Sequence, residues 1–346
     1  MKSFADVHVH LEQYAPEPVV AMLDTIASCG VTHTALQALC KYSVLENIAA
    51  LYWKQHYTKM QVYAFGSLHQ FDCFGDIPYE KQVEKLLSLG VDGMKFLDMK
   101  PDFRKKLGKG LNHPSYDRMF SLLEERQVPV MIHSGDPETF WDPAWVTDYH
   151  KKVGWFYGDG SFLTSEAIYR EVFAMLDKHP KLQVTLAHFF FLSNKPAEAV
   201  RVMETYPNVR FDLTPGGEMY LGFSKDIDFW HDFFIKYQDR ILFGTDSNAN
   251  KAINASLNTF VRQALTHDRS EFTGKCYGDM TIRGLELPQT VVEKITYGNF
   301  AAFAGEHPKP VSADGFRAAA EKVFDCIRDD PAQADTAAWL TEILAI

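Results

Sequence analysis

Two histidines lie one residue apart in an otherwise apolar segment near the start of the chain, FADVHVHLEQ at residues 4–13. In a β-strand, side chains alternate between two faces, so Asp6, His8 and His10 point to one face and the intervening valines to the other. Two imidazoles and a carboxylate are costly to bury without partners. The pair therefore indicates either a polar edge strand or two ligands of a metal ion.

Four further side chains of metal-binding type lie within or at the end of apolar, strand-like segments: Lys95, His133, His188 and Asp246. A single buried histidine is usually a core residue whose ring nitrogens are hydrogen-bonded. Together with the first pair, however, these residues put four histidines, a lysine and an aspartate at equivalent positions of five strands. A divalent cation would satisfy the ring nitrogens that such a cluster leaves without donors.

These side chains can meet only if the strands that carry them converge. Strand-like and helix-like segments alternate along nearly the whole chain, which predicts an α/β protein with a parallel sheet. Eight strand–helix units predict closure into a (β/α)8 TIM barrel. Strands are expected at 4–11, 31–39, 61–69, 91–97, 128–134, 182–190, 209–215 and 241–247. A doubly wound open sheet is the alternative, but no glycine-rich phosphate loop follows any of these strands.

The loops that follow the strands build the active site of such a barrel. Two of these connections are long, 134–163 and the irregular segment 247–283, and we expect both to cover the site. Residues 1–307 are expected to form the barrel as a single domain. Residues 308–346 are expected to form a helical tail packed against it.

The composition is that of an ordinary globular protein, with 46% hydrophobic and 23% charged residues. The formal net charge is −10 and no basic stripe is present, so a nucleic-acid partner is not expected. The five cysteines are widely spaced and never form a CxxC pair, which indicates free thiols in a reducing compartment. No segment resembles a signal peptide or could span a bilayer, so we expect a cytoplasmic protein without membrane contact.

An ordered set of motifs resembles the amidohydrolase superfamily, and more narrowly its branch with the aminocarboxymuconate semialdehyde decarboxylases and pyrone-dicarboxylate lactonases. The motifs are DVHVH, GVDGMKFL, VPVMIHSGDP, LQVTLAHFF, PNVRFDLTP, DRILFGTDSN and KITYGNFAAFAG. The resemblance covers nearly all the chain outside the tail. The set is specific for the superfamily and does not specify a substrate.

The resemblance implies that His8, His10 and His133 bind a divalent metal and that Asp246 completes the site. In hydrolytic members, the residue matching Asp246 also takes a proton from the metal-bound water. The residue matching His188 binds a second metal in binuclear members and serves as a base or electrostatic partner in mononuclear ones. Zinc suits this histidine-rich set best, and manganese or iron is tolerated by such ligands.

Lys95 leaves the number of metals, one or two per chain, open. In binuclear members, a lysine on the fourth strand is carboxylated and bridges two metals, and the GMKFL context fits that position. The alternative is a buried Lys95 paired with an acid such as Asp98, because an unpaired buried ammonium is costly. We expect one metal rather than two.

Substrate contacts are expected from the loops after the strands. The candidates are His69 at the end of the third strand, Glu138 and Trp141 in the aromatic segment after His133, and Tyr220 after the glycines that end the seventh strand. An aromatic lid held by its own packing and an ordinary turn are the structural alternatives.

The sequence thus predicts a metal-dependent hydrolase that cleaves a C–N amide or an ester or lactone bond of a small organic substrate. Asp246 would act as base on a metal-activated water, with His188 beside it. Non-oxidative decarboxylation of an unsaturated or aromatic acid is the alternative reaction. A non-catalytic metal-binding barrel is the alternative class, and the branch resembled suggests a homodimer.

Overall fold

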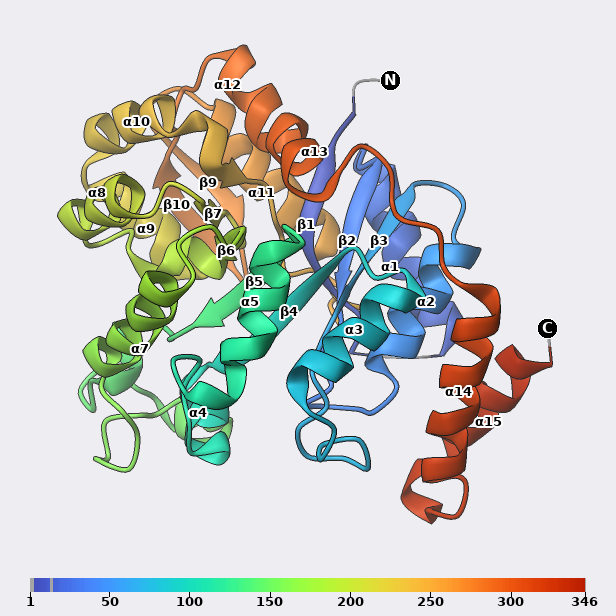
Figure 1. Ribbon diagram of the computed structural model, residues 1–346. Helices are drawn as coiled ribbons and strands as arrows, with labels where there is room; N and C mark the ends of the chain where they lie inside the picture. Colours follow the sequence, from blue (N-terminus) through green and yellow to red (C-terminus); the bar gives the residue numbers. More distant parts are fainter. Residues whose placement is uncertain (1–2, 13–14, 346) are drawn as a thin grey trace.

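Eight parallel strands form the centre of the protein in a computed structural model, which describes residues 3–12 and 15–345 (Figure 1). The strands are hydrogen-bonded in chain order, from the first to the eighth. They are β1 (Ala5–His10), β2 (His33–Gln37), β3 (Gln61–Gly66), β4 (Gly93–Met99), β5 (Val130–Ser134), β6 (Val184–Leu186), β7 (Val209–Asp212) and β8 (Ile241–Leu242). The predicted α/β TIM barrel is confirmed.

The barrel closes between β1 and the segment that follows β8. The amide of Val7 donates to the carbonyl of Phe243 at 3.0 Å, and the amide of His10 donates to that of Ser247 at 2.8 Å. The pairing of β1 with β2 shifts register between Asp6 and Val9, so β1 contains a bulge that simple alternation does not predict. Closure brings the end of β8 beside the two histidines of β1.

Helices surround the strands, and each buries an apolar stripe against them (Figure 1). The helices between strands are α1 (Pro16–Ser28), α2 (Glu46–His56), α3 (Tyr79–Leu89), α5 (Asp117–Glu125), α7 (Ser165–Lys178), α8 (Pro196–Thr205) and α10 (Ile227–Lys236). After β8 come α12 (Gln289–Glu293), a π-helical turn and α13 (Asn299–Ala304). Phe300 and Phe303 of α13 pack with Tyr63, Phe65 and other inward-facing side chains, which leaves the polar residues at the ends of the strands to line the opening.

Several elements lie where the sequence indicated only connections. These are α4 (Pro101–Leu107), α6 (Asp148–Lys152), α9 (Gly217–Lys225), α11 (Asn254–Thr266) and the antiparallel hairpin of β9 (Glu271–Lys275) and β10 (Asp279–Arg283). The expectation of an irregular segment at 247–283 is therefore wrong. Its apolar positions Leu257, Phe260, Val261 and Ala264 have helical spacing and are buried in α11.

The tail folds into α14 (Ala313–Ile327) and α15 (Ala334–Leu344), and α14 contacts α2 and α3 (Figure 1). A disulfide joins Cys326 of α14 to Cys73 in the loop after β3, with 6.5 Å between their Cα atoms. The prediction of five free thiols is wrong for these two residues, and Cys29, Cys40 and Cys276 are free. The two cysteines are 253 residues apart in sequence, and only the packing of the tail brings them together.

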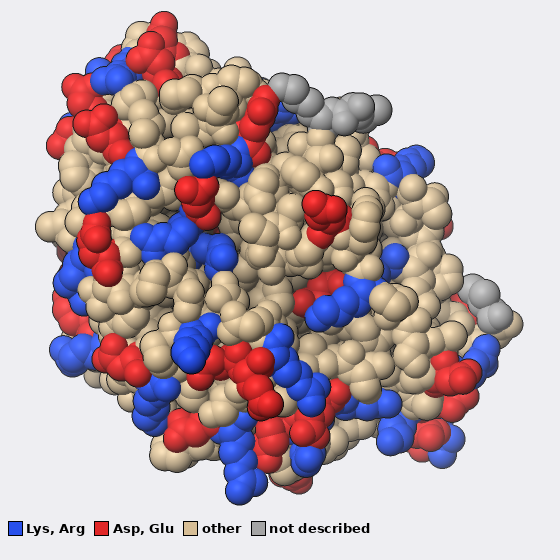
Figure 2. All heavy atoms as spheres, turned by 45° about the horizontal axis from the view of Figure 1, so that its top comes forward, with Lys and Arg blue, Asp and Glu red and all other residues tan. Residues whose placement is uncertain are grey.

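Charged side chains of both signs are interspersed over the face drawn in Figure 2. This distribution agrees with the sequence, in which basic residues form no stripe. Among the described residues, no helix combines the length and the apolarity that crossing a membrane requires.

Candidate metal centre

His8 of β1 is oriented by a buried carboxylate behind it. Its Nδ1 lies 2.7 Å from Oδ2 of Asp212, which ends β7, and both side chains are almost fully buried. A carboxylate accepts a hydrogen bond here, so Nδ1 carries the ring proton and Nε2 keeps its lone pair. The accepting nitrogen of His8 therefore faces the barrel opening.

His10 is fixed in the same way by the backbone. Its Nδ1 lies 3.1 Å from the carbonyl oxygen of Gln37 in β2, and a carbonyl can only accept. Its Nε2 lies 3.0 Å from Nε2 of His8. The two unprotonated nitrogens thus face each other, an arrangement that an electropositive group between or beside them would stabilise.

Asp246, four residues after the end of β8, places a carboxylate oxygen beside this pair. Its Oδ1 lies 3.3 Å from Nε2 of His10 and 3.8 Å from Nε2 of His8. One ligand atom from each of these three residues lies within 4.8 Å of the other two. Burial alone would raise the pKa of Asp246, but neighbouring positive charge, chiefly that of Lys251, outweighs burial and holds this pKa well below its usual range.

The close approach of β8 to β1 depends on Gly244. A Cβ at this position would lie 2.5 Å from Oγ1 of Thr214 and 3.1 Å from Cβ of His8. Asp246 itself has a positive φ of 57°, a conformation that aspartate tolerates better than most residues. The backbone between the two therefore sets the distance from the carboxylate to the histidines.

His133 and His188 form a second pair next to the first. Nδ1 of His133 lies 3.1 Å from Nε2 of His188. The other ring nitrogens face acceptors: Nε2 of His133 lies 3.2 Å from Oδ1 of Asp136, and Nδ1 of His188 lies 3.3 Å from the carbonyl of Thr214. Burial and the neighbouring His133 lower the pKa of His188 to about 3, so this ring is neutral at neutral pH.

Lys95 of β4 lies against the same cluster. Its Nζ is 2.9 Å from Nε2 of His8, and its pKa is lowered to about 8 because the side chain is buried. The alternative in which Lys95 pairs with Asp98 is wrong, because Asp98 accepts hydrogen bonds from the side chains of Tyr116 and Gln70. Lys95 is thus close enough to serve as a further ligand.

The profile of a protein family described as Amidohydrolase matches residues 72–303. The chain belongs to the amidohydrolase family. The match confirms the superfamily that the motifs predict and covers the strands that carry Lys95, His133, His188 and Asp246. Among curated proteins, none matches this amidohydrolase.

Solved structures similar to this amidohydrolase share its fold at low sequence identity. A TIM-barrel protein of Bordetella bronchiseptica has a TM-score of 0.56 and 16% identity over 87% of this chain and 98% of its own. A probable 2-pyrone-4,6-dicarboxylic acid hydrolase of Acinetobacter baumannii has a TM-score of 0.52 and 12% identity over 88% and 100% of the two chains. A 4-oxalomesaconate hydratase of Rhodopseudomonas palustris has a TM-score of 0.54 and 13% identity over 87% and 95%. At these identities the likeness establishes the fold alone.

Two carboxylates orient the histidines of this amidohydrolase, a role that the sequence did not indicate for either. Asp212 bonds His8 through one oxygen and the backbone amide of His188 through the other, at 2.7 Å each. Asp136 accepts from Tyr157 and Lys100, both at 2.5 Å, and faces His133. Asp212 ends a strand just as the other site residues do, which was a usable signal. The role of Asp136 required the path of the loop.

A left-handed turn positions His188. Four consecutive residues, 188–191, have φ values of 53–56°, whereas the sequence predicted that the strand would continue to 190. Such a conformation costs roughly 1–2 kcal/mol for each residue with a Cβ. The turn ends β6 early and directs the imidazole of His188 towards His133 and His8. Strain of this kind persists where the surrounding structure holds it, commonly at functional sites.

A cavity of about 990 Å³ opens above the histidines. His10, His133, His188 and Asp246 all line it. The two long connections contribute to its wall, as the sequence predicts. Its aromatic wall consists of Tyr42, Phe140, Tyr149, Trp155, Phe191 and Tyr277.

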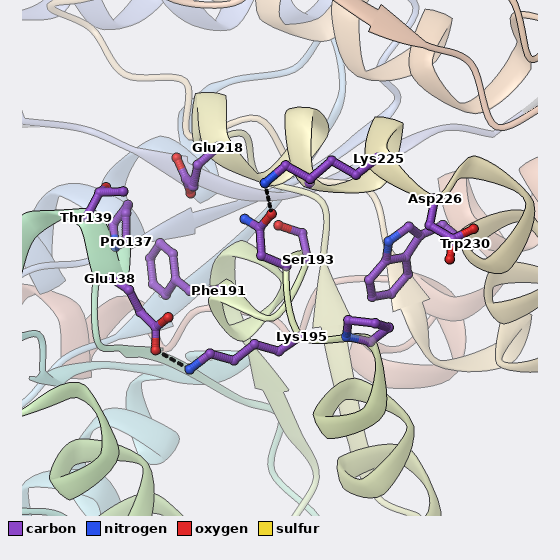
Figure 3. Close-up of a pocket in the computed structure, with 13 residues that line it drawn as sticks. Pro137, Glu138, Thr139, Phe191, Ser193, Lys195, Glu218, Lys225, Asp226 and Trp230 are labelled. Atoms are coloured by element: carbon purple, nitrogen blue, oxygen red, sulfur yellow. Dashed lines mark hydrogen bonds and ion pairs between the residues drawn. The ribbon is translucent and has the colours of Figure 1, made fainter. Parts of the chain in front are cut away.

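The predicted substrate contacts are less well placed. Tyr220 is buried against Phe223 and Phe260, and Trp141 packs on Tyr157; neither lines the cavity. His69 also lies outside the lining. Glu138 faces an adjoining pocket of about 440 Å³, where it pairs with Lys195 (Figure 3). These predictions were based on positions after the ends of strands, which do not determine the direction of side chains in the loops.

Proposed function

We propose that the protein is a metal-dependent hydrolase that cleaves an ester, lactone or amide bond in a small organic substrate. His8, His10 and Asp246 would hold a divalent cation, with His133, His188 and Lys95 as further ligands. The observation that carries this proposal is the orientation of the four imidazoles. In each ring, one nitrogen lies against an oxygen acceptor and carries the ring proton. The other nitrogens are unprotonated and face each other in two pairs, at 3.0 Å in His8 and His10 and at 3.1 Å in His133 and His188.

The donor set suits zinc, with manganese or iron as alternatives. When bound, the cation would supply Lewis acidity and would lower the pKa of a bound water to about 7. Asp246 is ionised, and its Oδ2 accepts from Nζ of Lys251 at 2.8 Å. Its Oδ1 is directed at the histidines, where it can bind or accept a proton.

His188 supplies a second proton acceptor. Its Nε2 carries a lone pair, because Nδ1 donates to the carbonyl of Thr214, and its lowered pKa keeps the ring neutral. Asp246 and His188 both line the cavity. A substrate bound there would meet a carboxylate and a neutral imidazole, the two groups that general-base catalysis uses most often.

The aromatic wall supports a planar or unsaturated substrate, because aromatic side chains pack best against flat apolar surfaces. The two cavity lysines do not add free positive charge. Lys100 is paired with Asp136, and Lys251 is paired with Asp246. The structures that share this fold include a probable 2-pyrone-4,6-dicarboxylic acid hydrolase and a 4-oxalomesaconate hydratase, a precedent that supports a small organic acid as substrate.

Decarboxylation is the second candidate, and Glu218 favours it. This residue lies in the first turn of α9 and lines both the main cavity and the adjoining pocket (Figure 3). Burial raises its pKa to about 7, and its Oε1 has no hydrogen-bond partner among the described residues. A carboxyl group that is protonated near neutral pH could deliver a proton to carbon after loss of carbon dioxide.

The two reactions separate in a direct assay. Purified protein loaded with zinc or manganese would be given lactones, amides and aromatic acids, with acid release and carbon dioxide measured in parallel. Hydrolysis predicts acid release from a lactone or amide that is lost in His10→Ala and kept in His113→Ala, which changes an exposed histidine. Carbon dioxide from an acid, without cleavage of any lactone or amide, would instead support decarboxylation. Protein that binds no divalent metal would contradict both.

A further inference from the structure

Three side chains outside the metal cavity form a cysteine–histidine–aspartate array. Sγ of Cys40 lies 3.9 Å from Nε2 of His69, and Nδ1 of His69 lies 2.7 Å from Oδ2 of Asp72. Cys40 follows β2, and the other two residues follow β3. A nucleophile, a base and a group that orients the base stand in the same relation in thiol enzymes.

His69 is held firmly in this arrangement. Its backbone amide donates to Gln82, and its carbonyl accepts from the same side chain, at 2.8 and 3.0 Å. The amide nitrogen of Asn47 lies 3.2 Å from Nε2, which favours a ring nitrogen that can accept the proton of Cys40. Burial lowers the pKa of His69, but Cys40 and Asp72 outweigh it and raise this pKa to about 10, so a proton that passes from Cys40 to the ring is held firmly there.

A disulfide lies beside this array. Cys40 and Cys326 line one pocket of about 350 Å³, and Cys73, the partner of Cys326, directly follows Asp72. The charged residues that line the pocket are Lys41, Asp72, Lys106 and Asp330. A thiol with its own base thus shares a pocket with a potential electrophile, the S–S bond that anchors the tail.

We infer that Cys40, His69 and Asp72 form a thiol–disulfide exchange site that acts on the Cys73–Cys326 bond. The S–H proton of Cys40 passes to Nε2 of His69. The sulfur of Cys40 bonds to that of Cys326, the original S–S bond breaks, and the sulfur of Cys73 leaves as a thiolate that takes the proton from His69. Atoms and charge balance, and no oxidant or reductant is consumed.

Exchange would connect the tail to the wall of the metal cavity. The native disulfide anchors α14 to the loop after β3, whereas the new one would anchor it to Cys40. Leu39 and Tyr42, on either side of Cys40, line the metal cavity. The cysteine to which Cys326 is bonded would therefore influence the position of this part of the cavity wall.

The first test compares alkylation of the three free thiols within the native, non-reduced full-length protein. Iodoacetamide labelling at pH 7, followed by peptide mass spectrometry, should modify Cys40 at least about tenfold faster than Cys29 or Cys276, because only Cys40 has a histidine beside it that can take the thiol proton. Burial raises the pKa of Cys29, and raises that of Cys276 to about 12. Cys29 is the more exposed, so exposure alone predicts the opposite order.

His69→Gln should remove the advantage of Cys40, and His113→Gln should leave it unchanged. Equal labelling of Cys40 in wild type and His69→Gln, or slower labelling than Cys29 in the wild type, would overturn the inference. The wild-type comparison needs no variant, so a folding defect in His69→Gln would not obscure it.

The second test asks which thiol reaches Cys326. In Cys73→Ser, mild oxidation with oxidised glutathione should produce a Cys40–Cys326 disulfide, found by mapping peptides after acid quenching. The wild type at pH 8 should contain the same peptide as a minor species, and Cys40→Ser should contain none. Pairing of Cys326 with Cys29 or Cys276, or only with glutathione, would contradict the exchange.

Discussion

The Nε2 atoms of His8 and His10 lie 3.0 Å apart, although the proton of each ring is committed to an acceptor on its other nitrogen. Two lone pairs at that distance repel unless a positive group lies close to both. Asp246 adds a carboxylate 3.3 Å from His10, which increases the demand for positive charge. The arrangement therefore favours a bound cation, beside or in place of the Lys95 ammonium that lies 2.9 Å from Nε2 of His8.

Removal of the metal should lower the stability of the folded protein. A ligand that binds only the folded state stabilises it by about 4 kcal/mol at a concentration 1,000 times its Kd. We expect EDTA to lower the melting temperature of the wild type and to leave His8→Ala and His10→Ala, which bind little metal, unchanged. His113→Ala is the control and should respond as the wild type does. An EDTA shift of equal size in His10→Ala would show that the cation binds elsewhere.

Asp212→Asn should weaken metal binding without removing a ligand. The substitution replaces an acceptor for the Nδ1 proton of His8 by an amide that can donate, so the preferred tautomer of His8 is lost. Loss of such a supporting carboxylate typically costs 10–100-fold in metal affinity. The measurement is competition for zinc with a chelator of known affinity.

Asp98→Asn provides a matched comparison for that experiment. Asp98 is also buried and accepts side-chain hydrogen bonds, but from Tyr116 and Gln70 rather than from a histidine. It should lose stability and keep its affinity for zinc. If both variants lost affinity to the same extent, general destabilisation rather than the orientation of His8 would be the cause.

Glu218 should make stability fall as pH rises. Its folded-state pKa is raised to about 7, above the unfolded value, so the folded state holds the proton more tightly. The contribution is therefore complete below about pH 4.5 and is lost as pH rises through 7, by roughly 3 kcal/mol in total. Glu218→Gln removes this titration, so its stability relative to wild type should increase from pH 5 to pH 8. Urea unfolding at four pH values measures the difference, and a constant difference would contradict the raised pKa.

The sequence predicts the barrel and the cluster well because both follow from one repeated feature, a polar residue at the end of an apolar strand. His8, His10, His133, His188 and Asp246 converge because parallel strands of a closed barrel end on one rim. The contacts that orient these side chains depend on local backbone conformation, which the spacing of residues in the sequence does not predict. The left-handed turn at 188–191 and the bulge in β1 are of this kind.

Loops and long-range pairs were the least predictable parts. Tyr220 follows a strand as His188 does, yet α9 turns it into the core, where its hydroxyl donates to the carbonyl of Leu213. The Cys73–Cys326 disulfide depends on where the tail packs, which periodicity does not reveal. A residue that follows a strand in the sequence can therefore be assigned to the correct end of the barrel. The direction of its side chain depends on the local fold of the loop.

Gly244→Ala should disturb the approach of the segment after β8 to His8 in the metal centre. The new Cβ would lie 2.5 Å from Oγ1 of Thr214 and 3.1 Å from Cβ of His8, so the Thr214 side chain must move and the segment after β8 must shift slightly away from His8. Overpacking of this kind typically costs 1–3 kcal/mol. Because Asp246 follows two residues later, we also expect weaker zinc binding, measured by the same chelator competition. Gly298→Ala is the control, since the nearest atom to its new Cβ is 3.9 Å away and zinc binding should not change. Wild-type affinity in Gly244→Ala would show that the spacing of β1 and β8 does not set the geometry of the site.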